Sequence, residues 1–286
     1  MANHLSTTQL EQFESEGIVY PIRILDKSEA VALQTRYQVL RDRMADWSTA
    51  KQLPKSYLVS TWVNNLMRHP TILDAVESLL GPDILCWAAT FFAKEPNNAG
   101  FVGWHQDITY WGLKPGDKVV TAWLALTDAK SDNGCMCTIP GTHKASLRKH
   151  EFHPGSDNLL AGDQEVILSA EEEQNIQHIE LEPGEMSIHH SRLLHGSVAN
   201  TSSRPRVGLS INYFAVEVRQ TIPNVTDSAT LVRGQDRGHF ALEPRPEADF
   251  DAASIAAYKK FIQSQSGLGA YDDRAASAHA KLEAIA

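Results

Sequence analysis

Two side chains that can bind a metal stand two positions apart in segment 103–111, Gly-Trp-His-Gln-Asp-Ile-Thr-Tyr-Trp. The aromatic and branched residues of this segment predict an extended strand over 104–111. Residues two apart on a strand point to the same face, so His105 and Asp107 would project together. An imidazole nitrogen and a carboxylate oxygen side by side are two ligands of a divalent-metal site.

The pair alone is a weak signal, because with 12 histidines in the chain about one His-x-Asp pair is expected by chance. His178 and Glu180 form a similar pair, which is typical of a solvated strand. A third ligand strengthens the case: His195 lies far downstream, directly before Gly196, where the backbone can approach closely. Two histidines and one carboxylate form the facial triad of non-haem Fe(II) oxygenases.

An arginine follows the third candidate ligand at a distance of eleven positions (206 − 195 = 11). Arg206 stands at the head of a predicted strand, where its planar guanidinium could bind a carboxylate bidentately. Arg204 is the alternative, although it precedes Pro205 in what is predicted to be a turn.

Hydrophobic periodicity predicts helices at 6–16, 28–44, 70–80 and 252–265. From residue 83 the period changes to two, and strands are predicted at 84–94, 104–111, 119–126, 135–139, 176–181, 185–190, 197–200 and 206–218. Short strands with regularly spaced turns favour a sandwich or jelly roll. The expected fold is mainly β with a helical outer layer and a double-stranded β-helix core, cupin-like.

The expected organisation is a single domain over residues 1–286. A helical N-terminal layer would span 1–82, the jelly-roll core about 83–218, and a C-terminal loop and helix 219–286. A formal net charge of -9 argues against a nucleic-acid surface. No secretion signal or membrane span is apparent, and three cysteines give no disulfide framework, so a cytoplasmic protein is expected.

Together these motifs resemble the phytanoyl-CoA dioxygenase-like family of Fe(II)- and 2-oxoglutarate-dependent oxygenases. The resemblance covers about residues 90–213. It rests on Trp-His-Gln-Asp at 104–107, Thr-Ala-Trp-Leu-Ala-Leu at 121–126, Pro-Gly-Thr-His-Lys at 140–144 and its preceding strand, and His-Gly-Ser at 195–197 with its arginine.

The resemblance implies a role for each matching residue. His105, Asp107 and His195 would bind Fe(II), and Arg206 would bind the distal carboxylate of 2-oxoglutarate. Further cosubstrate contacts would come from Trp123, Ser197 and Thr90. The implied reaction uses O₂, converts 2-oxoglutarate to succinate and CO₂, and hydroxylates an unactivated C–H bond of a small molecule.

Residues of a substrate pocket are harder to predict. Phe92, Tyr110 and Trp111 would form an aromatic wall near the iron, and Arg233 and Arg237 in the tail could hold an anionic substrate group. One of the adjacent histidines at 189 and 190 would point inward, because neighbours on a strand alternate faces.

Three other interpretations stay open. The same iron chemistry also yields desaturation, ring closure or demethylation, and a regulator that hydroxylates proteins would carry the same motifs. A non-catalytic, cupin-like metal-binding protein could present similar ligands, but it would not need Arg206 or the Trp123 pocket. The substrate and the oligomeric state cannot be predicted from these motifs.

Overall fold

The computed structural model describes residues 4–45, 53–153, 157–160, 164–223 and 227–267. Its framework is two β-sheets that face each other. The large sheet contains β1 (Ile18–Arg23), β2 (Leu53–Pro54), β3 (Ile84–Lys94), β6 (Val119–Ala125), β11 (Glu185–His190), β13 (Arg206–Ala215), β15 (Ser228–Arg233) and β16 (Ala241–Leu242). The small sheet contains β4 (Val102–His105), β7 (Met136–Thr138), β10 (Gln177–Ile179) and β12 (His195–Ser197).

The large sheet has the order β1-β11-β6-β13-β3-β15-β16, with β2 beside β3, and the small sheet has the order β10-β7-β12-β4. Two further pairs are β5 (Leu113–Lys114) with β14 (Arg219–Gln220) and β8 (Glu151–Phe152) with β9 (Gln164–Glu165). Apart from the parallel pair β15–β16 the sheets are antiparallel, and the described strands form no closed barrel; this arrangement confirms the predicted jelly-roll type of fold.

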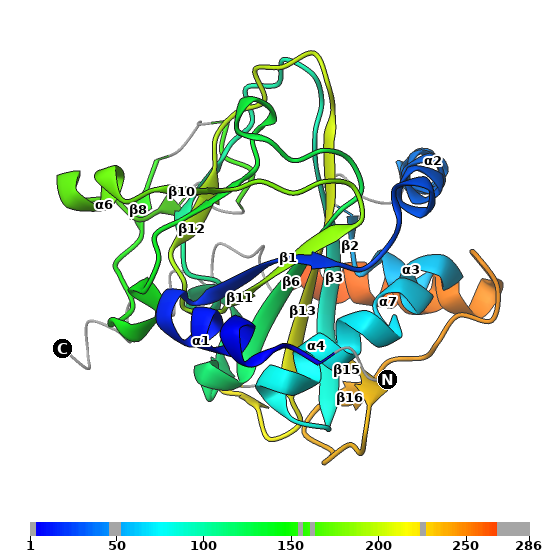
Figure 1. Cartoon of the computed structure of the whole chain (residues 1–286). Helices are drawn as coiled ribbons and strands as arrows, with labels where there is room; N and C mark the ends of the chain where they lie inside the picture. Colours follow the sequence, from blue (N-terminus) through cyan, green and yellow to red (C-terminus); the bar gives the residue numbers. More distant parts are fainter. Residues whose placement is uncertain (1–3, 46–52, 154–156, 161–163, 224–226, 268–286) are drawn as a thin grey trace.

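The helices are α1 (Thr7–Glu16), α2 (Lys27–Met44), α3 (Thr61–Leu66), α4 (Pro70–Leu80), α5 (Ile108–Trp111), α6 (Ala170–Gln174) and α7 (Ala252–Gly267), with 3-10 turns at Ser56–Leu58, Gly116–Lys118, Ser131–Asn133 and Thr142–Lys144. Helices α2, α3, α4 and α7 lie on one side of the large sheet, and the small sheet lies on the other (Figure 1). None of the described helices is both long and apolar enough to cross a bilayer.

Local signals explain where the first helix begins and ends. The Ser6 side chain accepts a hydrogen bond from the backbone of Gln9, whose side chain accepts one in return from the Ser6 backbone. This capping box satisfies two N–H groups that the helix leaves unpaired. Gly17, at φ 82°, ends the helix in a left-handed conformation that costs glycine little.

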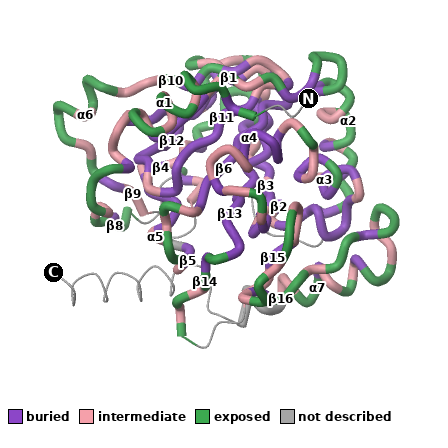
Figure 2. The backbone as a smooth tube through the Cα atoms, turned by 60° about the horizontal axis from the view of Figure 1, so that its bottom comes forward, coloured by how far each residue is buried: buried purple, intermediate pink, exposed green. Residues whose placement is uncertain are grey.

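Strand β6 shows how the sheet separates two environments. Val120, Ala122 and Leu124 belong to the core beneath the helices. Trp123 and Ala125 instead pack with residues of the small sheet, as expected for a strand whose side chains alternate between faces. Figure 2 shows β6 and β13 buried along their length, whereas α6 is mostly exposed. The space between the two sheets is therefore where the inward-pointing polar residues meet.

The predicted strand over 104–111 is wrong in its second half. Strand β4 ends at His105, and Asp107 adopts helical angles (φ -48°, ψ -47°) at the start of α5. The β-preferring residues here are used for packing: Trp111 lies in an apolar cluster, with its ring 5.1 Å from that of Trp87. Burial thus overrides local strand propensity. Helix α3 and strand β15 were also missed, the latter within a tail predicted to be irregular.

Candidate metal centre

Three of the predicted residues converge between the sheets. The candidate ligand atoms of His105, Asp107 and His195 all lie within 4.8 Å of one another, and the three residues are buried. His105 and His195 stand opposite each other on the antiparallel strands β4 and β12. Oδ1 of Asp107 lies 3.4 Å from Nε2 of His105 and 3.8 Å from Nε2 of His195. The structure thus brings together residues 90 positions apart (195 − 105 = 90).

Backbone carbonyls fix how the two imidazoles are presented. Nδ1 of His105 lies 2.9 Å from the carbonyl oxygen of Gly103, and Nδ1 of His195 lies 2.9 Å from that of Leu193. A carbonyl only accepts hydrogen bonds, so each Nδ1 carries the proton. Each Nε2 is then a free lone pair directed at Asp107, which is the form that binds a metal.

The charge state of the cluster also suits a divalent cation. Burial, and the neighbouring His105 and His189, hold the pKa of His195 well below its usual range. Burial by itself would raise the pKa of Asp107, but the nearby imidazoles of His195, His105 and His189 bring that pKa well below its ordinary value. A carboxylate and histidines of this kind match the donor set that Fe(II) prefers in such sites.

A row of polar side chains holds the outer oxygen of Asp107. Thr121 donates a hydrogen bond of 2.7 Å to Oδ2, and Asn212 donates one of 3.0 Å to the Thr121 hydroxyl. Nε2 of His189 lies 3.4 Å from the same Oδ2. Residues 189, 121 and 212 stand side by side on β11, β6 and β13. Asp107 lies just beyond the end of β4, and this row of side chains holds its Oδ2, so that Oδ1 faces His105 and His195.

Replacing Thr121 by valine is expected to lower the affinity for Fe(II) by about 10- to 100-fold, because Asp107 loses the hydroxyl that orients it. Competition with a chromophoric chelator under anaerobic conditions measures the change. Thr121→Ser keeps the hydroxyl and serves as the control with near wild-type affinity. Equal affinities for the valine and serine variants would contradict this role.

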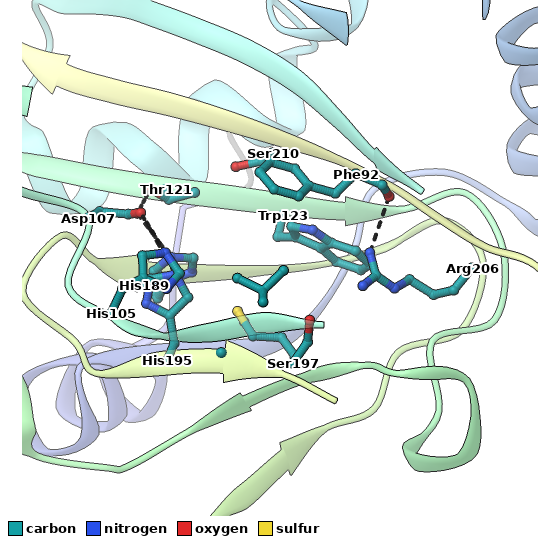
Figure 3. A pocket seen from close by; sticks show the side chains of 13 residues that line it. Phe92, His105, Asp107, Thr121, Trp123, His189, His195, Ser197, Arg206 and Ser210 are labelled. Carbon is teal, nitrogen blue, oxygen red and sulfur yellow. Dashed lines mark hydrogen bonds and ion pairs between the residues drawn. The ribbon is translucent and has the colours of Figure 1, made fainter. Parts of the chain in front are cut away.

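The converging residues lie at one end of a cavity between the two sheets. Its lining is Phe92, Val102, His105, Asp107, Thr121, Trp123, Met136, His189, His195, Gly196, Ser197, Arg206 and Ser210 (Figure 3). Of the two adjacent histidines, the one that points inward is therefore His189. Of the other predicted site residues, Phe92, Trp123, Ser197 and Arg206 line this cavity.

Arg206 stands at the opposite end of this cavity from the histidines (Figure 3). Its Nε donates to the carbonyl of Gly134 and one terminal nitrogen, Nη1, donates to that of Phe92, at 3.0 and 3.2 Å. Burial lowers the pKa of Arg206 to about 10, so it stays charged at neutral pH. Among the described residues no carboxylate pairs with it, which leaves a buried cation facing the cavity.

Arg204, the alternative, is accounted for elsewhere. Its Nη2 lies 2.9 and 2.8 Å from the two carboxylate oxygens of Asp132, at the exposed surface. It is therefore not among the residues that line the cavity.

Close packing of Trp123 against the sheet shapes the middle of the cavity. A Cβ atom on Gly208 would lie 2.0 Å from the indole ring of Trp123. Only glycine lets the ring lie this close to β13. The Arg206 guanidinium lies 5.5 Å from the centre of this ring, within the range of a cation–π contact.

Three residues predicted for the substrate pocket, Trp111, Arg233 and Arg237, are not among the residues that line this cavity. Arg233 lies outside the cavity lining and pairs with Asp74 and Glu77. Arg237 is exposed and lies outside the lining. Trp111 packs against Trp87, as described above. The side chain of Tyr110 lies outside the described part of the chain.

Thr90 is also not among the residues that line the cavity. Ser210 on β13 lies between Thr90 on β3 and Trp123 on β6, and Ser210 does line the cavity. Residues that the sequence reasoning missed are Thr121, Ser210, Val102 and Met136. Thr121 could have been found, because it lies two positions from Trp123 on the same strand face.

Comparison with known proteins shows the family to which the chain belongs. Residues 13–208 match the family described as Phytanoyl-CoA dioxygenase (PhyH). The chain belongs to the phytanoyl-CoA dioxygenase family. This membership confirms the family predicted from the motifs.

Three relatives illustrate the similarity. Human peroxisomal phytanoyl-CoA dioxygenase is 30% identical over 154 residues, 52% of this chain and 44% of the human protein. A probable alpha-ketoglutarate-dependent hypophosphite dioxygenase from Stutzerimonas stutzeri is 28% identical over 175 residues, 58% of each chain. The solved structure of the non-heme monooxygenase ThoJ is 30% identical, with a TM-score of 0.81, and covers 95% of this chain and 98% of ThoJ. The chain spans about half the length of the curated relatives it matches.

Proposed function

We propose that the protein is an Fe(II)- and 2-oxoglutarate-dependent dioxygenase that hydroxylates an unactivated C–H bond of a small molecule. The accompanying reaction would decarboxylate 2-oxoglutarate to succinate and CO₂. The observation that carries this proposal is the pairing of two features in one cavity. A histidine–aspartate–histidine cluster lies at one end, and the unpaired, buried cation of Arg206 lies at the other.

Each side chain then has a defined task. His105, His195 and Oδ1 of Asp107 would hold Fe(II), which supplies the activation of O₂ when bound. Arg206 would bind the distal carboxylate of 2-oxoglutarate, and Ser197 would donate a further hydrogen bond to it. The apolar lining, including Phe92 and the Trp123 ring, would keep water from the reacting atoms.

Other outcomes of the same iron chemistry differ only in the fate of the substrate. Desaturation, ring closure and demethylation are therefore the alternatives to hydroxylation. Halogenating relatives carry Ala or Gly where this chain has Asp107, so the carboxylate favours oxygenation. A purely metal-binding protein would have no use for a buried arginine across the cavity.

A cytoplasmic location is also proposed, since all three cysteines are unpaired thiols. Disulfide-linked cysteines in protein isolated without reductant would contradict this location.

Anaerobic reconstitution with Fe(II) and 2-oxoglutarate tests the proposal. A weak visible charge-transfer band at roughly 500 nm is expected, followed by succinate formation when air is admitted. A folded protein that binds Fe(II) but gives neither band nor succinate would leave the metal-binding interpretation as the better one. Product analysis with candidate small molecules then distinguishes hydroxylation from its alternatives.

A further inference from the structure

We infer that Lys94 is a positioning residue of the cosubstrate site and that it holds the Ser197 hydroxyl toward the carboxylate bound by Arg206. The inference rests on the proposed function, because it adds a residue to the binding of the same 2-oxo acid. Lys94 was not predicted as a site residue from the sequence.

Lys94 is a buried lysine with an unusual set of partners. It is the last residue of β3, stands opposite Arg206 on β13, and is 1% exposed. Its Nζ lies 2.7 Å from Oγ of Ser197 and 3.4 Å from the Ser197 carbonyl oxygen, and it also donates to the carbonyl of Val198. Three oxygen acceptors match the three N–H donors of an ammonium group. None of the three is a carboxylate.

The other lysine buried in the described part of the chain shows the usual arrangement. Lys55 is 5% exposed and pairs with Glu243 at 2.5 Å. A buried cation without such a partner is costly, and here Lys94 and Arg206 stand next to each other without one. Burial and the charge of Arg206 accordingly lower the pKa of Lys94 to about 6. A carboxylate bound by Arg206 would raise that pKa again and favour the ammonium form of Lys94.

The hydrogen bond from Lys94 also constrains Ser197. Oγ of Ser197 accepts from Nζ, so the hydroxyl hydrogen must point elsewhere. Ser197 lines the cavity, and no described group accepts that hydrogen. The hydroxyl is therefore available as a donor to an anion in the cavity, alongside the guanidinium of Arg206.

Gly134 allows Lys94 and Arg206 to lie close together. Its carbonyl accepts from Nε of Arg206. A Cβ atom at this position would lie 3.0 Å from Nζ of Lys94 and 2.5 Å from the Val198 carbonyl oxygen. With φ at +77°, the position also favours glycine for its backbone. The backbone here thus leaves room for Lys94 beside Arg206.

Replacing Lys94 by methionine tests the inference through binding and not through turnover. Protein saturated with Fe(II) is titrated anaerobically with 2-oxoglutarate and with 2-oxopentanoate, which carries a methyl group in place of the distal carboxylate. The affinity for 2-oxoglutarate is expected to fall about tenfold, the value of one charge-assisted interaction. The affinity for 2-oxopentanoate should stay unchanged.

Lys55→Met is the matched control, since it removes the other buried ammonium, which is not among the residues that line the cavity. It should lower thermal stability without changing the preference between the two acids. An unchanged preference in Lys94→Met, or an equal loss for both acids, would overturn the inference. If Lys94→Met does not fold, Ser197→Ala carries the same test, and an unchanged preference there overturns the positioning role. Failure of wild type to bind 2-oxoglutarate would instead refute the proposed function.

Discussion

Replacement of Asp107 by alanine is expected to abolish succinate formation and to lower the affinity for Fe(II) by more than about 100-fold. This loss is larger than that typical of replacing a residue that only hydrogen-bonds a metal ligand. The physical reason is that Oδ1 is the only carboxylate oxygen directed at Nε2 of both His105 and His195 among the described residues. Chelator competition measures the metal affinity, and assay of succinate measures turnover of the cosubstrate.

Asp117→Ala is a suitable control for this experiment. Asp117 is a largely exposed carboxylate whose side chain is 72% accessible, and it lies near His190 and Arg192 outside the cavity lining. Its removal should leave both measurements unchanged. If Asp107→Ala retained wild-type metal affinity, the proposed ligand set would be wrong.

Arg206→Met is expected to weaken 2-oxoglutarate binding by about 100- to 1,000-fold, because a buried carboxylate would lose up to two charge-assisted hydrogen bonds. The affinity for the metal alone should change little, since Arg206 lies at the far end of the cavity (Figure 3). Anaerobic titration of the Fe(II)-loaded protein gives the dissociation constant.

The chain offers a matched control two residues away. Arg204→Met removes an arginine that bonds Asp132 at the surface, where an ion pair contributes little. Wild-type affinity for 2-oxoglutarate is expected for this variant. If affinity were lost in Arg204→Met and kept in Arg206→Met, the assignment of the carboxylate to Arg206 would be wrong.

Local signals in the sequence were sufficient for much of the fold. Helix α1 lies within one residue of its predicted span because Ser6 and Gly17 cap it. Strand β11 was predicted at residues 185–190, the span it occupies. The candidate ligands were found for a different reason: their residue types and spacing are characteristic even though Asp107 lies on a helix start and not on the predicted strand.

What the sequence could not provide were contacts between distant segments. Arg233 resembled a free cation in a polar tail, but strand β15 places it against Asp74 and Glu77 on α4. The partners of Lys94 are likewise more than 100 positions away, at Ser197 and Val198 (197 − 94 = 103). Such pairings depend on strand order in the sheets, which periodicity alone does not determine.

The division of the cavity between two sheets has a consequence for which 2-oxo acids the protein can accept. His105 and His195 belong to β4 and β12 of the small sheet, whereas Arg206 belongs to β13 of the large sheet. Their separation is set by how the sheets pack, and packed cores deform little. We therefore expect selection by carbon-chain length: oxaloacetate, one carbon shorter than 2-oxoglutarate, and 2-oxoadipate, one carbon longer, should each engage one end of the site but not both.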